Sequence, residues 1–193
     1  MGYGILFLGL VVFFAVHSVS LVNQPWRDRM VDKLGEWPWK GLYSLVAIVG
    51  LVLIVQGYGL ARQDPLVLYM SPNWLKHVAL LLLLPVFPLL LAAYLPGRIR
   101  QATRHPMLLA TKLWAIAHLL VNGMLADVLL FGTFLAWAVL DRISLRQRAQ
   151  EPGLTLPSSR ANDLIAVIAG IGLYVAFVFG VHAWLIGVSP MGR

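Results

Sequence analysis

Long apolar runs separated by short polar segments dominate this chain. Crossing about 30 Å of hydrocarbon takes about 20 helical residues, and six runs come near that length. They are Tyr3–Val22, Gly41–Leu60, Trp74–Leu95, Pro106–Val121, Met124–Leu140 and Leu164–Ile186. The fourth and fifth runs are short and meet at Asn122-Gly123, a tight-turn signal, which predicts a shallow hairpin. The pattern therefore predicts an all-α, polytopic membrane bundle of about six transmembrane helices, forming a single domain over residues 1–193.

Composition supports the membrane assignment and limits the chemistry. The chain has 193 residues, of which 60% are hydrophobic and 12% charged, whereas soluble domains are typically about 45–50% apolar and 25% charged. It contains no cysteine. A disulfide framework, an iron–sulfur site and a thiol nucleophile are therefore excluded. Any redox chemistry must come from a bound cofactor.

The positive charge indicates how the helices are oriented. The formal net charge is +7, but the basic residues are scattered over short loops, which favours topology signals over a nucleic-acid surface. With the N-terminus outside, 11 of the 15 lysines and arginines fall on the cytoplasmic side. They are Arg27, Arg29, Lys33, Lys40, Arg98, Arg100, Arg104, Arg142, Arg146, Arg148 and Arg160. The positive-inside rule thus predicts that both termini face the exterior.

Two polar connections are long enough to carry features of their own. Residues 23–40 combine Trp26, Trp37 and Trp39 with alternating charges, which predicts a cytoplasmic surface helix with its rings at headgroup depth. Residues 141–163 form the longest polar loop. A solvated loop is the simplest interpretation of its arginines, and contact with anionic lipid or a partner is the alternative.

The histidines are the main candidates for a functional site. His17 lies about five residues from the cytoplasmic end of the first run. If Lys112 extends toward the cytoplasmic surface, His118 comes to a similar depth. Two neutral imidazoles on different helices could bind one haem iron axially. The alternative is structural, with each histidine bonded to a neighbouring group, as His17 would be to Ser44.

The remaining polar residues have simpler interpretations. His77 and His182 lie near the outer face, where headgroup-level polar residues are common. The pair Arg104 and His105 precedes Pro106, which starts a helix and leaves the basic pair facing phosphates or an anionic ligand.

Asn122 and Asp127 are expected to cap and connect the predicted hairpin. We nevertheless include Asn122, with Arg104 and His105, among the candidate cofactor-binding residues.

Four short segments resemble one protein family. "FFAVHS" (13–18), "RHP" (104–106), "LWAIAHLLVNG" (113–123) and "LFG" (130–132) occur in the order found in the NnrU family of bacterial membrane proteins. That family is associated with nitrite and nitric oxide reduction and includes the 15-cis-zeta-carotene isomerases. The resemblance implies haem b with histidine ligands at His17 and His118, in a bacterial inner (cytoplasmic) membrane. The isomerase motif has a cysteine where Ala115 stands, so a thiolate ligand is unavailable there.

This resemblance leaves the reaction open. Ferrous haem with one histidine released could bind a hydrophobic polyene and assist cis–trans isomerisation, or bind nitric oxide, or pass electrons to a membrane redox partner.

Two alternatives use the same residues differently. A membrane methyltransferase of the isoprenylcysteine type would use Arg104 and His105 to hold S-adenosylmethionine, with Glu151 as the downstream glutamate. A non-catalytic accessory factor would instead act on a reductase through its cytoplasmic loops.

Overall fold

The computed structural model describes residues 1–146 and 158–191, and these fall into two compact units. Unit 1 combines Met1–Tyr69 with Gly123–Ser144, and unit 2 contains the described residues of Met70–Asn122 and Leu145–Arg193. Within the described ranges both units are helical, and an isolated bridge between Val67 and Met124 is the sole β-type pairing. The prediction of an all-α chain is confirmed.

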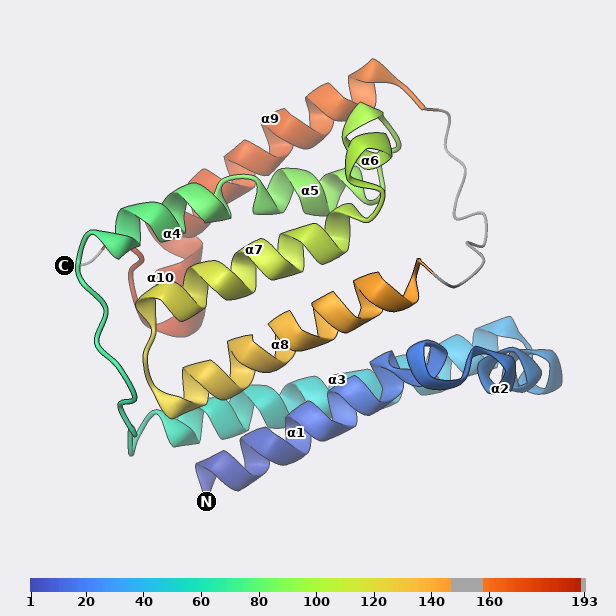
Figure 1. Ribbon diagram of the computed structural model, residues 1–193, viewed down its shortest axis with the longest axis horizontal. Helices are drawn as coiled ribbons and strands as arrows, with labels where there is room; N and C mark the ends of the chain where they lie inside the picture. Colours follow the sequence, from blue (N-terminus) through green and yellow to red (C-terminus); the bar gives the residue numbers. More distant parts are fainter. Residues whose placement is uncertain (147–157, 192–193) are drawn as a thin grey trace. The chain divides into compact units, whose positions relative to one another are not determined.

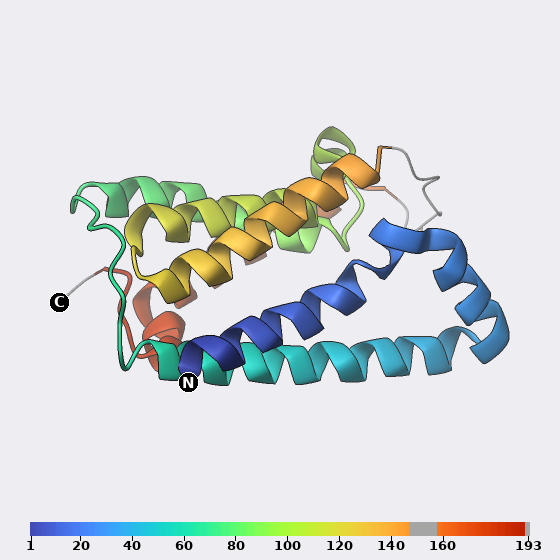
Figure 2. The same cartoon turned by 60° about the horizontal axis from the view of Figure 1, so that its bottom comes forward.

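Unit 1 contains four helices. They are α1 (Gly2–His17), α2 (Val19–Leu34), α3 (Glu36–Ala61) and α8 (Leu125–Ser144). Helices α1 and α3 lie side by side along their lengths, while α2 connects their ends (Figures 1 and 2). Helix α8 packs on this pair through a buried cluster that includes Leu10, Phe14 and Ala126.

Four buried glycines allow α1 and α3 to approach closely. Gly2 and Gly9 lie seven residues apart on α1, and Gly50 and Gly57 lie seven apart on α3. A Cβ atom at Gly9 would come within 2.6 Å of the backbone nitrogen of Ile54. In lipid, helices associate through such close backbone contact because no hydrophobic force drives them together. The glycine repeat therefore fixes an antiparallel pair.

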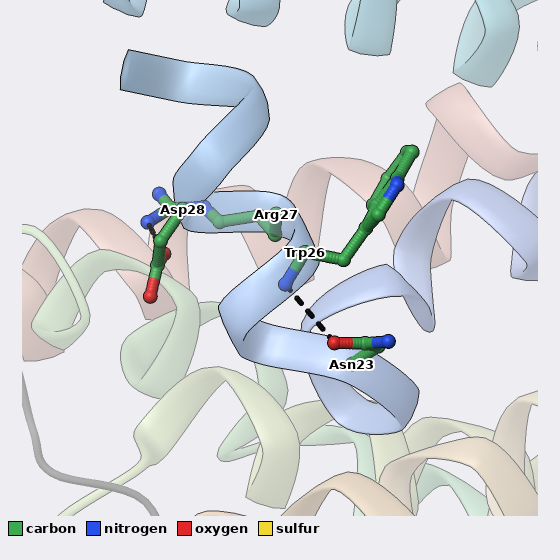
Figure 3. A network of polar contacts seen from close by, with 4 residues as sticks. All are labelled: Asn23, Trp26, Arg27 and Asp28. Carbon is green, nitrogen blue, oxygen red and sulfur yellow. Dashed lines mark hydrogen bonds and ion pairs between the residues drawn. The ribbon is translucent and has the colours of Figure 1, made fainter. Parts of the chain in front are cut away.

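The first apolar run bends where the sequence predicts a continuous helix to Val22. Helix α1 ends at His17, and α2 continues beyond Ser18 at an angle of 50°. Inside α2, Asn23 is non-helical, and its side-chain oxygen accepts a hydrogen bond of 3.0 Å from the Trp26 backbone (Figure 3). Asn23 thus acts as an internal N-cap, with Pro25 in the first turn, where a missing N–H is tolerated.

The predicted surface helix at 23–40 is therefore confirmed in part. The helix exists, but it ends at Leu34, and Gly35 at a φ of 86° makes the turn into α3. Trp37 and Trp39 belong to the first turns of α3, where the Trp39 ring lies 5.9 Å from that of Trp26. The headgroup depth of these rings stays a prediction.

The opposite end of unit 1 is joined by backbone hydrogen bonds. The Gly123 carbonyl accepts from the backbone N–H groups of Leu68 (2.8 Å) and Tyr69 (3.2 Å), and Leu125 donates to Leu66 at 2.8 Å. A Cβ atom at Gly123 would overlap the Tyr69 carbonyl oxygen. Glycine is needed here because two backbone segments touch, and its φ is not positive.

Asp127 anchors the start of α8 at this same end. It is 3% exposed and accepts hydrogen bonds from the Tyr58 hydroxyl at 2.5 Å and the Met124 backbone at 3.1 Å. The expected capping role of Asp127 is confirmed, and the bond to Tyr58 also ties α8 to α3. Burial raises the pKa of the nearby Tyr69 hydroxyl, and the Asp127 carboxylate adds to the rise.

Unit 2 is built from shorter segments. They are α4 (Leu75–Leu83), α5 (Val86–Ala92), α6 (Arg98–Thr103), α7 (Pro106–Val121), α9 (Arg160–Ala176), a π-helical turn η1 (Phe177–Val181) and α10 (His182–Ile186). Helix α5 packs against both α7 and α9, and α4 packs against α7. The α5–α9 contact is close, because a Cβ atom at Gly170 would come within 2.6 Å of Pro88.

Side-chain bonds to the backbone close one end of unit 2. The Asp163 carboxylate accepts from the backbone N–H groups of Arg98 (2.9 Å) and Ile99 (3.1 Å), so a residue of α9 caps α6. The Asn162 amide donates to the Pro96 carbonyl at 2.8 Å. This end carries the basic residues of 98–104, and their position at the cytoplasmic face stays a prediction.

The predicted count of six spans is not supported. Within residues 1–146 and 158–191, three helical stretches are long and apolar enough to cross a membrane, or four if the bent α1–α2 pair is one span. Helix α7 has 16 residues, about 24 Å at 1.5 Å each, which is short of the hydrocarbon thickness. Helix α8 has 20 residues but carries Asp127, Asp141 and Arg142.

The predicted hairpin at Asn122-Gly123 stays a prediction. The two helices that would form it belong to separate units, α7 to unit 2 and α8 to unit 1.

Candidate functional site

His17 is the last residue of α1, at the end of unit 1 that leads into α2 and its basic residues. Its Nδ1 atom lies 2.7 Å from the carbonyl oxygen of Phe13. A carbonyl can only accept, so Nδ1 carries the proton and Nε2 keeps the lone pair. This bond to a neighbouring carbonyl is of the kind that the structural alternative predicts, with Phe13 of the same helix as the partner at Nδ1 in place of Ser44.

Aromatic rings from three helices surround His17. Phe13 of α1 stacks on the imidazole with ring centroids 4.1 Å apart and planes inclined by 23°. Tyr43 of α3 lies at 5.3 Å, and Trp137 of α8 lies at 5.9 Å, perpendicular to the imidazole. These rings pack on the imidazole itself, and aromatic faces of this kind are also the surface that a flat, apolar ligand prefers.

Trp137 adds an unusual polar feature to this aromatic cluster. Its Nε1 atom is buried and has no hydrogen-bond partner among the described residues. Buried donors are nearly always bonded, so an unpaired one calls for an explanation, such as a group that binds there. The residues around His17 therefore fit a cofactor with an apolar body and a hydrogen-bond acceptor.

His118 lies in the last turn of α7, in unit 2. Its Nδ1 atom is 2.8 Å from the carbonyl oxygen of Trp114, which repeats the arrangement at His17. The Trp114 ring lies 5.3 Å from the imidazole and also packs on a buried cluster of α5 and α7. The Trp114 carbonyl thereby sets the tautomer that leaves the lone pair of His118 on Nε2.

His182 is the residue that the sequence interpretation missed. Its ring lies 6.5 Å from that of His118, with the planes inclined by 24°. Its Nδ1 atom is 2.7 Å from the Val188 carbonyl. The sequence predicts a headgroup-level residue next to Trp184, and that neighbour is 83% exposed. One signal in the sequence could have identified His182. The apolar runs that contain His118 and His182 are both predicted to end at the outer face of the membrane.

Of the other sequence-predicted residues, Asn122 lies beside His118, whereas Arg104 and His105 do not. Arg104 and His105 precede α7, whereas His118 and Asn122 lie at its far end. Arg104 is the sole non-glycine residue with positive φ in the described ranges, at 60°, and Pro106 begins the helix as predicted. The Asn122 backbone N–H donates to the His118 carbonyl at 2.8 Å, which completes the helix end.

His77 is separate from both histidine settings. Its Nδ1 atom lies 3.3 Å from the Trp74 carbonyl, and it lines a shallow, open depression with Leu80, Leu84 and Tyr174. Glu151, which the methyltransferase alternative requires, lies outside the described residues, as do residues 147–157 of the predicted cytoplasmic loop.

The donor set distinguishes two kinds of metal site. In residues 1–146 and 158–191, no three histidine, cysteine, aspartate or glutamate side chains lie close enough together to hold a metal ion. A bare zinc ion usually needs at least three protein ligands, whereas porphyrin iron already has four nitrogen ligands and needs one or two. The histidines therefore fit haem better than a bare ion.

Comparison with known proteins identifies a family over nearly the whole chain. The model for NnrU protein matches residues 5–190, which confirms the resemblance seen in the sequence. Neither the curated proteins nor the solved structures include a match.

Proposed function

Because this chain belongs to the NnrU family, we propose that it is a haem b-binding, multi-pass protein of a bacterial inner membrane. In this proposal His17 and His118 are the iron ligands, and membrane lipid surrounds the protein. Arg104, His105 and Asn122 remain proposed contributors to cofactor binding at the ends of α7.

The setting of His17 carries the proposal. The hydrogen bond from Nδ1 to Phe13 orients the imidazole and leaves the lone pair on Nε2. Phe13, Tyr43 and Trp137 then provide apolar faces, and the unpaired indole N–H of Trp137 supplies a donor for a polar substituent of the ligand.

His118 is the second ligand in this proposal. Its orientation by the Trp114 carbonyl matches that of His17 by Phe13, with both acceptors four residues earlier in the same helix. This shared arrangement is the usual one for a metal-binding histidine, whose other ring nitrogen donates to a carbonyl or carboxylate.

The bound haem would supply electron transfer or, at an open axial position, a site for nitric oxide or for the double bond of a polyene. The residues of this chain bind the group, orient the imidazoles and exclude water. We propose cis–trans isomerisation of a polyene as the reaction of a catalytic protein. For a protein that is not catalytic, we propose a role in nitrite or nitric oxide metabolism with a membrane redox partner.

The test is the haem content of the purified full-length chain. We expect about one haem b per chain and sharp visible bands after reduction. His118→Ala and His17→Ala should each weaken haem affinity by at least about tenfold, since each removes a ligand. His77→Ala is the matched control, because its ring also bonds a backbone carbonyl but has no proposed role.

A chain that stays colourless when haem is supplied in excess would contradict the proposal. Binding of S-adenosylmethionine by that colourless chain would favour the methyltransferase alternative. If the colourless chain restores the activity of a reductase without binding any cofactor, the result would favour the accessory role.

A further inference from the structure

Unit 2 contains a histidine pair that the proposed function does not use. His118 and His182 lie 64 residues apart in the sequence, yet their ring centroids are 6.5 Å apart. Two half-buried imidazoles at this distance are close enough to share a ligand. From this pair, and resting on the proposed function, we infer that His182 is an axial ligand to haem iron held by His118.

The spacing of the rings agrees with a shared iron. A metal–imidazole bond is about 2.0 Å long, and each ring centre lies about 1.2 Å from its nitrogen, so two trans imidazoles have centroids about 6.4 Å apart. The observed separation is 6.5 Å, and the planes are inclined by 24°. Direct ring stacking, in contrast, brings centroids closer than this, as at Phe13 and His17, where the distance is 4.1 Å.

Both rings are in the tautomer that ligation requires. The Nδ1 atom of His118 bonds the Trp114 carbonyl at 2.8 Å, and that of His182 bonds the Val188 carbonyl at 2.7 Å. Because carbonyl oxygens only accept, both protons lie on Nδ1 and both lone pairs on Nε2.

The number of ligands then decides what kind of metal the pair can hold. Two imidazoles alone leave a bare zinc or iron ion short of donors, and the described residues offer no third one in a cluster. Porphyrin iron lacks only its two axial ligands. His118 and His182 complete that set within one compact unit.

This assignment creates a competition for one coordination position. His17, His118 and His182 all present Nε2 as the ligating nitrogen, but the iron has two axial positions. His118 is common to both pairs, so His17 and His182 contest the second position. Removal of either one then lowers the affinity for haem, and with haem in excess the other binds in its place.

The experiment uses optical and electron paramagnetic resonance spectra of the full-length chain with haem in excess. We expect the unmodified protein, His17→Ala and His182→Ala each to be six-coordinate and low-spin. The double variant His17→Ala/His182→Ala should be five-coordinate and high-spin. Added imidazole should restore its low-spin spectrum, which shows that the double variant is folded and lacks only a ligand.

The matched control is His17→Ala/His77→Ala, which should stay low-spin. A His182→Ala variant that is already high-spin would also support the inference and would remove His17 from the pair. A high-spin His17→Ala variant, or a double variant as low-spin as His17→Ala, would overturn it. Absence of haem from the unmodified protein would instead defeat the proposed function, so the two failures are distinguishable.

Discussion

The two units of this protein hold their helices together in different ways. In unit 1, α1 and α3 are in backbone contact along a seam of glycines, among them Gly9 and Gly57. In unit 2, α9 and α5 also meet closely at Gly170, but the shorter segments are joined in addition by side-chain bonds to backbone groups, such as those of Asp163 and Asn162. Both solutions suit lipid, which provides no hydrophobic force between helices. The difference teaches that two long helices can be held by backbone contact along their lengths, whereas helices interrupted by breaks also need side-chain caps at their ends.

The largest expected effect comes from closing the glycine seam. A Cβ atom at Gly57 would overlap the backbone of Leu6, so Gly57→Ala must push α1 away from α3. We expect a loss of about 3 kcal/mol in the free energy of unfolding, at the upper end for overpacking. Denaturant unfolding of the full-length chain in detergent measures it.

The matched control for this change is Gly59→Ala on the same helix, since nothing lies within 4 Å of a Cβ atom there. Alanine is the better helix former by about 1 kcal/mol, so stability should stay equal or rise. Equal losses at the two positions would show that the seam does not hold unit 1.

A smaller effect is expected when the cap in unit 2 is removed. Asp163→Ala leaves the backbone N–H groups of Arg98 and Ile99 without their acceptors. Loss of such a cap costs about 2 kcal/mol at most, and thermal unfolding measures it. Asp163→Asn retains one side-chain oxygen and should recover part of the loss.

Asp64→Ala provides the comparison in unit 1. Tyr3 donates to the backbone carbonyl of Asp64, not to its carboxylate, so this change should alter stability by less than about 0.5 kcal/mol. A loss as large as that of Asp163→Ala would end the contrast between polar caps in unit 2 and backbone contact in unit 1.

The smallest expected effect has the opposite sign. Arg104 has a φ of 60°, which costs a residue with a Cβ atom about 1 kcal/mol. Arg104→Gly should therefore raise the midpoint of thermal unfolding slightly. Arg100→Gly, inside α6, should lower it by a similar free energy. Destabilisation by both changes would mean that the Arg104 side chain contributes more than its backbone strain costs.

Much of the helical content could be predicted from the sequence, but the breaks and pairings could not. The apolar runs locate α3, α7 and α9 well, because each helix repeats one pattern over many residues. The bend at Ser18 has no strong local signal, and the first run therefore reads as one helix to Val22. The seven-residue glycine spacing is present in the sequence, but which helices it joins is set by contacts between distant segments.

The same limit explains the candidate site. The Pro106 start of α7 and the cap at Asp127 are local and were predicted. His182 was placed at an interface because Trp184 is its neighbour, whereas its nearness to His118 depends on how α7 and α10 pack in unit 2. A long-range pair of this kind leaves no periodic trace in the sequence.

The bonds from His17 to Phe13 and from His118 to Trp114 end on main-chain oxygens. Replacing the side chain at position 13 or 114 leaves the backbone acceptor in place. The hydrogen bond that orients each imidazole is therefore kept when these side chains are mutated. Rotation about the side-chain bonds is also restricted before any ligand arrives, which lowers the entropy lost on association. An all-helical backbone can in this way prepare its imidazoles for coordination without a dedicated carboxylate behind each one.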